Sequence, residues 1–182
     1  MNEWATVVLG VGSPLMGDDG LGVSVVDRLR GRWGGVDDLA LLDGGTWSMR
    51  VLPFIESADR LLIVDAIHVG DEPGAIVRLE KEEIPRHLRQ KLSPHQIELG
   101  EVLAVAELRG RFPDEAVAMG IEPASVELRD GLSDVVEAAV PDLLERIEAQ
   151  LDAWGLAPEG ARASRARDPE RPAPTNGEVS RA

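Results

Sequence analysis

Short apolar runs alternate with amphipathic stretches along most of the chain, and this alternation predicts its secondary structure. Runs of aliphatic and β-branched residues predict strands at residues 6–11, 39–42, 61–64, 75–79 and 116–121. Apolar positions at helical spacing predict helices at residues 21–33, 48–57 and 133–154, and another that begins near residue 93. This order predicts an α/β fold, a three-layer sandwich with a mixed, mostly parallel twisted sheet of about five strands flanked by helices.

Two local patterns refine this prediction. The loop between the third and fourth strands is shorter than the roughly dozen residues that a parallel crossover needs, so we expect these two strands to form an antiparallel pair. The later helix has a clear start signal at residues 93–96. Ser93 is a good N-cap, Pro94 suits the first helical position, and Gln96 completes a capping box.

The first strand leads into a glycine-rich loop that carries two adjacent carboxylates, Asp18 and Asp19. The glycines at positions 10, 12 and 17 lack the spacing of a dinucleotide-binding fingerprint. No Lys-Ser/Thr pair follows the last glycine, as a phosphate-binding loop requires, and two carboxylates would repel a phosphate. A cation is therefore the expected ligand of this loop.

Two more strands end on acids, Asp43 and Asp65. If the first three strands are parallel neighbours, all these carboxylates meet at one edge of the sheet. Like charges at close range are unfavourable unless a cation or a proton intervenes, so their convergence indicates a site. Structural alternatives remain for single residues, because an acid of the glycine loop could cap the following helix and Asp43 could form an Asx turn.

His95 joins these acids as a candidate ligand. It lies in the first turn of its predicted helix, where the helix dipole disfavours the imidazolium. The neutral imidazole is the form that binds a metal. His68 follows Asp65 on a loop and is a weaker candidate, whereas His87 is expected on a solvated helix face.

Composition narrows the possible partners. The chain has 182 residues, a net charge of −14 and no cysteine. The negative charge argues against nucleic-acid and anionic-membrane partners, and the absence of cysteine excludes disulfides and thiolate sites. We expect a cytoplasmic protein, because no signal peptide and no apolar run of about 20 residues is present. Residues 1–155 are expected to form a single domain, and the Pro/Arg-rich residues 156–182 a disordered tail.

Four separated motifs together resemble the hydrogenase maturation endopeptidases. They are LGVGSPLMGDDGLG at residues 9–22, DGGT at 43–46, LLIVDAI at 61–67 and SPHQ at 93–96. The resemblance covers about residues 6–154 in the same order. It departs from the family at Ser13-Pro14, where Asn is frequent, and at Asp19, where some members have Glu.

This resemblance implies a function and a set of roles. The family removes the C-terminal extension from the large subunit of nickel–iron hydrogenases, so the implied partner is the large-subunit precursor of a hydrogenase. Nickel would be carried by that substrate rather than permanently bound, and the enzyme is expected to be a monomer. The implied metal-binding and catalytic residues are Asp19, Asp65 and His95, and the implied substrate-binding residues are Asp43, Gly44, Gly45 and Thr46.

Asp18 is then left to cap the helix that begins near Gly20 or to hold the loop. Two other functions stay open. A non-catalytic, metal-sensing chaperone of the large subunit would share every ligand. A small-molecule hydrolase or nucleotide-binding domain would need a basic group near the glycine loop, and residues 6–27 contain none.

Overall fold

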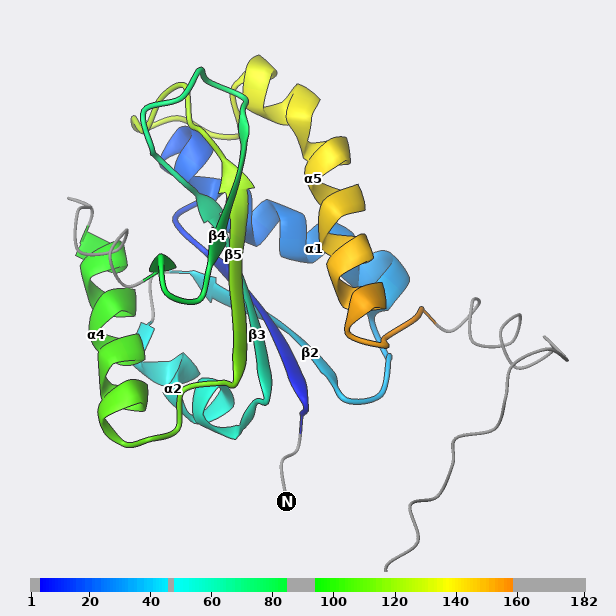
Figure 1. Cartoon of the computed structure of the whole chain (residues 1–182). Coiled ribbons are helices and arrows are strands. Elements are labelled where there is room, and N and C mark those ends of the chain that lie inside the picture. Colours follow the sequence, from blue (N-terminus) through cyan, green and yellow to red (C-terminus); the bar gives the residue numbers. More distant parts are fainter. Residues whose placement is uncertain (1–3, 46–47, 85–93, 159–182) are drawn as a thin grey trace, which may run out of the picture.

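The computed structural model describes residues 4–45, 48–84 and 94–158, and its elements follow the order expected from the sequence (Figure 1). They are β1 (Thr6–Val11), the 3₁₀ helix η1 (Gly17–Gly20), α1 (Leu21–Trp33), β2 (Leu39–Gly45), α2 (Ser48–Ser57), β3 (Arg60–Ala66), β4 (Ile76–Glu80), α4 (Pro94–Leu108), β5 (Glu115–Ile121) and α5 (Asp134–Ala153). None of the helices in these ranges is long and apolar enough to cross a membrane.

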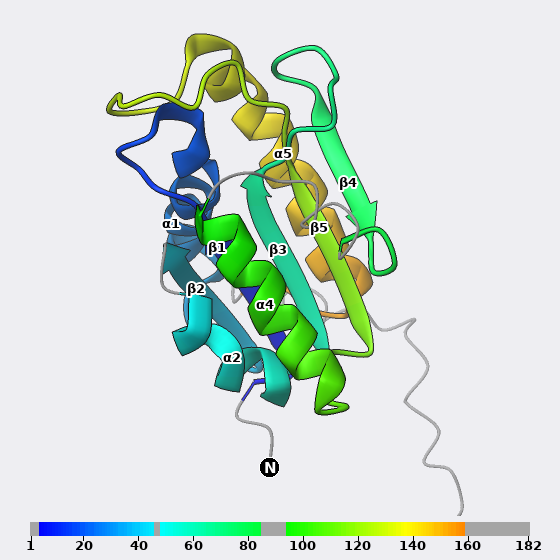
Figure 2. The ribbon, with the colours of Figure 1, turned by 90° about the vertical axis from the view of Figure 1, so that its left-hand side faces the viewer.

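The strands form one sheet in the order β2-β1-β3-β5-β4. The first four are parallel, and β4 is antiparallel to β5. Helices α1 and α5 cover one face, and α2 and α4 cover the other, as the perpendicular views of Figures 1 and 2 show. The structure therefore confirms the predicted three-layer α/β fold with a mixed, mostly parallel sheet.

The position of β4 differs from the expectation. It was expected to pair with the strand before it, but β4 pairs with β5, which lies between β3 and β4. The direction of β4 is antiparallel to β3, as expected from the short connection, but its neighbour is not. The short connection between β3 and β4 makes β4 run back antiparallel to β3. It does not prevent β5, which comes later in the chain, from inserting between them.

Alternating residues of the central strands build two hydrophobic cores. Leu62 and Val64 belong to the core beneath α1 and α5, whereas Leu61 and Ile63 belong to the core beneath α2 and α4. Side chains of a strand alternate between the two faces of the sheet. Asp65 therefore lies on the face of β3 that is covered by α2 and α4.

The packed part of the chain reaches two residues beyond the expected domain boundary at residue 155. Leu156 and Ala157 are buried, and the backbone N–H of Leu156 donates to the carbonyl of Leu151 at 3.0 Å. Leu156 joins the core beneath α1 and α5. Of the expected tail, residues 159–182 lie outside the described part of the chain.

Candidate active site at the carboxyl edge of the sheet

Three neighbouring parallel strands bring their carboxyl ends to one edge of the sheet. Strand β1 lies between β2 and β3, and η1 follows β1 at that edge. Asp19 lies in η1, Asp65 lies near the end of β3, and Asp43 lies near the end of β2. In open α/β sheets ligands bind beyond the carboxyl ends of the strands, so the acids occupy the usual position of a functional site.

Asp19 and Asp65 are both buried, with 2% and 3% of their surface exposed. The backbone N–H of Ser13 donates to Oδ2 of Asp19 at 2.7 Å, which fixes the carboxylate against the glycine loop. Helix η1 packs against β3, the strand that carries Asp65. Burying a carboxylate is costly unless charged or hydrogen-bonding groups compensate it, so two buried carboxylates at this edge mark it as a candidate functional site.

His95 is the second residue of α4, which covers the face of the sheet that carries Asp65. The side chain of His95 lies outside the described part of the chain. Within that part, no three His, Asp or Glu residues form a group that could hold a metal ion. Coordination by Asp19, Asp65 and His95 together therefore stays a prediction, and so does the capping role of Ser93, which is not described either.

Asp18 has a different role from Asp19. It is 1% exposed, and its carboxylate accepts hydrogen bonds from the backbone N–H groups of Ala124, Ser125 and Ser133 at 2.8, 3.0 and 2.6 Å. The Ser133 hydroxyl donates a fourth bond at 2.9 Å. Helix α1 begins after Gly20 without a side-chain cap, so the capping alternative for Asp18 is wrong. Asp18 instead holds the glycine loop against residues 124–133.

These bonds also determine the ionisation of Asp18. Burial acts to raise the pKa of its carboxyl group, but hydrogen bonds from Ser133, Ser125 and Ala124 outweigh burial and lower the pKa below its ordinary value. Asp18 is therefore anionic at neutral pH, and its carboxylate already accepts four hydrogen bonds within the protein.

We expect Asp18→Asn to destabilise the fold, even though asparagine is similar in shape. Asn retains one oxygen and presents an amide NH₂ where N–H donors converge, so buried donors lose their acceptor. The loss should be about 1–3 kcal/mol in the free energy of unfolding, measured by urea denaturation. Ser133→Ala removes only the hydroxyl bond and should cost less. Equal stability of Asp18→Asn and the wild type would show that the four bonds contribute nothing.

Asp43 lies at an open pocket of about 630 Å³ that Ser13, the hydrogen-bond donor to Asp19, also lines. The pocket is lined by Gly12, Ser13, Pro14, Leu15, Val23, Asp43, Gly44, Gly45, Arg50 and Val51. Asp43 is exposed and pairs with Gly10 in the β1–β2 ladder, whose register shifts between Gly10 and Val11, and the Asx turn stays a prediction. Three of the four expected substrate-binding residues thus line one pocket, and the fourth, Thr46, lies outside the described residues.

Glu122 is a buried acid that the sequence analysis did not select. It follows β5 directly, is 1% exposed, and its Oε2 accepts hydrogen bonds from the backbone N–H groups of Val69, Gly70 and Asp71 at 2.8, 3.2 and 3.3 Å. Its Oε1 contacts Nδ1 of His68. The weaker candidate ligand His68 is thus engaged by Glu122. An acid directly after a buried strand, the signal that indicated Asp65, was also available for Glu122.

Glu122 makes stability depend on pH. Burial acts to raise its pKa, but hydrogen bonds from Val69, His68 and Asp71 and the charge of His68 lower the pKa below the ordinary 4.5. A carboxyl group with a lowered folded pKa stabilises the fold above the unfolded pKa. This contribution is lost as pH falls through the folded pKa.

We therefore expect Glu122→Gln to be less stable than the wild type at pH 7, with a difference that narrows as the pH falls below about 4.5. Urea denaturation of both proteins between pH 7 and pH 3 measures this difference. A stability difference that stays constant over the whole range would show that the charge of Glu122 is not what matters.

Comparison with known proteins identifies the family. A family model described as hydrogenase maturation protease matches residues 23–150. The hydrogenase 2 maturation protease of Escherichia coli is 38% identical over 151 residues, which cover 82% of this chain and 92% of that protein. The hydrogenase expression/formation protein HoxM of Cupriavidus necator is 37% identical over 154 residues, covering 84% and 76%.

The fold agrees with the same family. The solved structure of the hydrogenase maturating endopeptidase HybD from Escherichia coli superposes with a TM-score of 0.80 at 36% identity, covering 86% of this chain and 98% of that one. A hydrogenase 2 maturation peptidase from a Thaumarchaeota archaeon gives a TM-score of 0.62 at 30% identity, covering 84% and 99%. Sequence and structure thus agree over nearly all of the described chain, which belongs to the hydrogenase maturation protease family.

Proposed function

We propose that this protein is an endopeptidase that removes the C-terminal extension of a nickel–iron hydrogenase large-subunit precursor after nickel has been inserted. Membership of the family supports peptide hydrolysis in hydrogenase maturation. The observation that carries the finer proposal is the burial of two carboxylates, Asp19 and Asp65, on packed elements at the carboxyl edge of the sheet.

The donor set fits nickel that arrives with the substrate. Carboxylate and imidazole groups are suitable nickel ligands without any thiolate, and this chain has no cysteine. We propose that Asp19, Asp65 and His95 contact the nickel, and that its remaining positions are filled by groups of the precursor. A bound metal can polarise a peptide carbonyl or activate water for hydrolysis.

The neighbouring pocket would hold the polypeptide. Asp43, Gly44 and Gly45 line an open pocket beside the glycine loop that fixes Asp19. Glycines leave the backbone accessible, so an extended segment can approach it closely. We propose that the precursor segment next to the scissile bond lies in this pocket.

Cleavage of purified precursor tests the proposal. The protein is incubated with nickel-loaded and nickel-free large-subunit precursor, and the products are measured by mass spectrometry. The proposal predicts one C-terminal cut, in the nickel-loaded precursor only. A stable complex with an uncut precursor would instead support a chaperone, and equal cutting of both forms would contradict recognition of nickel.

A further inference from the structure

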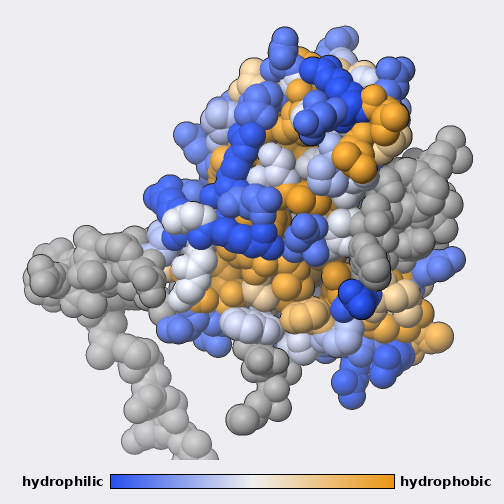
Figure 3. All heavy atoms as spheres, turned by 180° about the vertical axis from the view of Figure 1, so that it is seen from behind, coloured by the Kyte–Doolittle hydropathy of each residue, from blue (hydrophilic) through white to orange (hydrophobic). Residues whose placement is uncertain are grey.

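Exposed hydrophobic side chains gather around the candidate site. In the described part of the chain the large exposed ones are Leu15, Met49, Val69, Leu108, Val126, Leu128 and Val135. All of them except Leu108 lie on loops or helix starts that follow the carboxyl ends of the strands. Figure 3 shows hydrophobic side chains at the surface of this end of the molecule, among strongly hydrophilic ones.

Three of these residues, Leu15, Val126 and Leu128, form what we call the apolar lip. Leu15 is 66% exposed, Val126 44% and Leu128 83%. A parallel bridge joins Met16 to Arg129, so Leu15 and Leu128 are neighbours on two adjacent chain segments. The lip therefore combines residues that are more than 100 positions apart in the sequence.

The lip is held in place by the loops that carry it. The backbone N–H of Arg129 donates to the carbonyl of Leu15 at 3.1 Å, and that of Gly17 donates to the carbonyl of Arg129 at 2.9 Å. The carboxylate of Asp18 accepts hydrogen bonds from the backbone N–H groups of Ala124 and Ser133, and so fixes both ends of the loop that carries Val126 and Leu128. Loops fixed in this way do not fold their apolar side chains inward, so the lip keeps an apolar area in contact with water that a partner could cover.

The occupant of this surface follows from its continuity with the site. Leu15 lines the same pocket as Asp43, and it lies between Ser13 and Asp19, which are joined by a hydrogen bond. A folded protein docked at this pocket can cover Leu15 together with the adjoining Leu128. A small molecule in the pocket would leave Leu128 uncovered.

We propose that the apolar lip is the docking surface for the folded body of the large-subunit precursor. This inference rests on the proposed function. The lip supplies affinity and orientation, whereas the buried acids contact the metal and the scissile segment. Residues of this kind change the binding of substrate without changing the chemical step, so their loss raises KM and leaves kcat unchanged.

The test uses steady-state cleavage of nickel-loaded precursor by Leu128→Ser and Val126→Ser, because these two lip residues do not line the pocket proposed to hold the scissile segment. Each variant should raise KM about tenfold or more and change kcat less than about twofold. Both residues are exposed, so the melting temperatures should equal that of the wild type. An unchanged KM in both variants would overturn the proposal.

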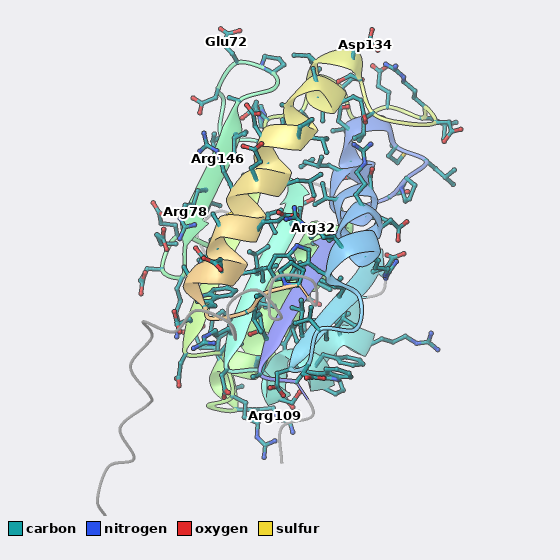
Figure 4. The ribbon with its side chains drawn as sticks, turned by 90° about the vertical axis from the view of Figure 1, so that its right-hand side faces the viewer. Arg32, Glu72, Arg78, Arg109, Asp134 and Arg146 are labelled. Atoms are coloured by element: carbon teal, nitrogen blue, oxygen red, sulfur yellow. The ribbon has the colours of Figure 1, made fainter. Side chains whose placement is uncertain are left out.

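Leu108→Ser is the matched control. Leu108 is 88% exposed but ends α4, and Figure 4 shows the next residue, Arg109, at the opposite end of the molecule from Glu72 and Asp134. Its KM should equal that of the wild type. An equal rise of KM in Leu108→Ser would mean that any exposed leucine matters, which contradicts a local docking surface.

Two further measurements separate this inference from its alternatives. Sedimentation of the wild type at assay concentration should show a monomer. A wild-type dimer that dissociates in Leu128→Ser would instead assign the lip to a second copy of this chain and overturn the proposal. Calorimetry of the binding of uncut precursor compares the affinities of the wild type and Leu128→Ser, so this measurement does not depend on hydrolysis. Weaker binding by Leu128→Ser supports the lip even if the wild type does not cut, and equal binding overturns it.

Discussion

Asp65→Asn should abolish cleavage of the nickel-loaded precursor while the protein stays folded. Asparagine keeps the size of the buried side chain and removes the negative charge that a nickel ligand supplies. Loss of a group that merely supports a metal ligand changes affinity or activity 10- to 100-fold, so loss of a ligand should reduce kcat/KM by more than about 100-fold. Asp19→Asn should behave in the same way, because Asp19 is equally buried and also lies at the carboxyl edge.

The stability of these two variants distinguishes a functional site from a structural one. Asparagine keeps the size of each side chain and can still accept a hydrogen bond, such as the one that Ser13 donates to Asp19, so the melting temperature should stay about the same. Asp114→Asn is the matched control, since Asp114 is exposed and directly precedes β5, at the opposite edge of the sheet, so its kcat/KM should equal that of the wild type. If Asp19→Asn keeps full activity and Asp18→Asn is inactive in a folded protein, our ligand assignment within the glycine loop is wrong.

Among glycine-to-alanine substitutions in α1, Gly22→Ala should cause the larger loss of stability. A Cβ at Gly22 would lie 2.2 Å from the carbonyl oxygen of Val64 and 2.4 Å from that of Val11. These are backbone atoms of β3 and β1, and they cannot move without disturbing the sheet. We expect α1 to shift outward, at a cost of about 3 kcal/mol or more in the free energy of unfolding. The melting temperature should fall by roughly 6–12 °C.

Gly31→Ala provides the matched control in the same helix. Apart from the neighbouring residues and backbone of α1 itself, no atom lies within 4 Å of a Cβ at Gly31, so alanine only improves helix propensity. It should stabilise the protein by about 0.5–1 kcal/mol. Thermal unfolding of both variants by circular dichroism gives the comparison. If both substitutions change the melting temperature in the same direction, the close approach of α1 to β1 and β3 is not what requires glycine at position 22.

Much of the fold could be predicted because apolar periodicity reports burial directly. The runs at residues 6–11 and 61–64 became the central strands, since residues buried on both faces of a sheet are continuously apolar. Strand β4 has only one neighbour and a mixed burial pattern. Its partner depends on where the later strand β5 enters the sheet. Local sequence carries no signal for that choice.

The candidate site was less predictable, because a side chain's role depends on distant partners. Asp18 and Asp19 are adjacent and chemically identical, so only the family resemblance gave them different roles, and the donors that occupy Asp18 come from residues 124–133. Glu122 and Asp65 share the same position after or near the end of a strand. Glu122, however, is occupied by the loop at residues 68–71, a contact that only the tertiary structure reveals. Sequence pattern located the acids, and hydrogen-bond partners separated their roles.

We expect Asp19 and Asp65 to contact nickel that the precursor carries. Nickel-edge X-ray absorption can detect this contact, by comparing the nickel-loaded precursor alone with the precursor frozen immediately after mixing with excess protein. Additional oxygen or nitrogen ligands should surround nickel in the mixture with the wild type, and fewer in the mixture with the Asp65→Asn variant. An unchanged nickel spectrum in a mixture where the wild-type complex has formed would contradict a contact between these acids and nickel.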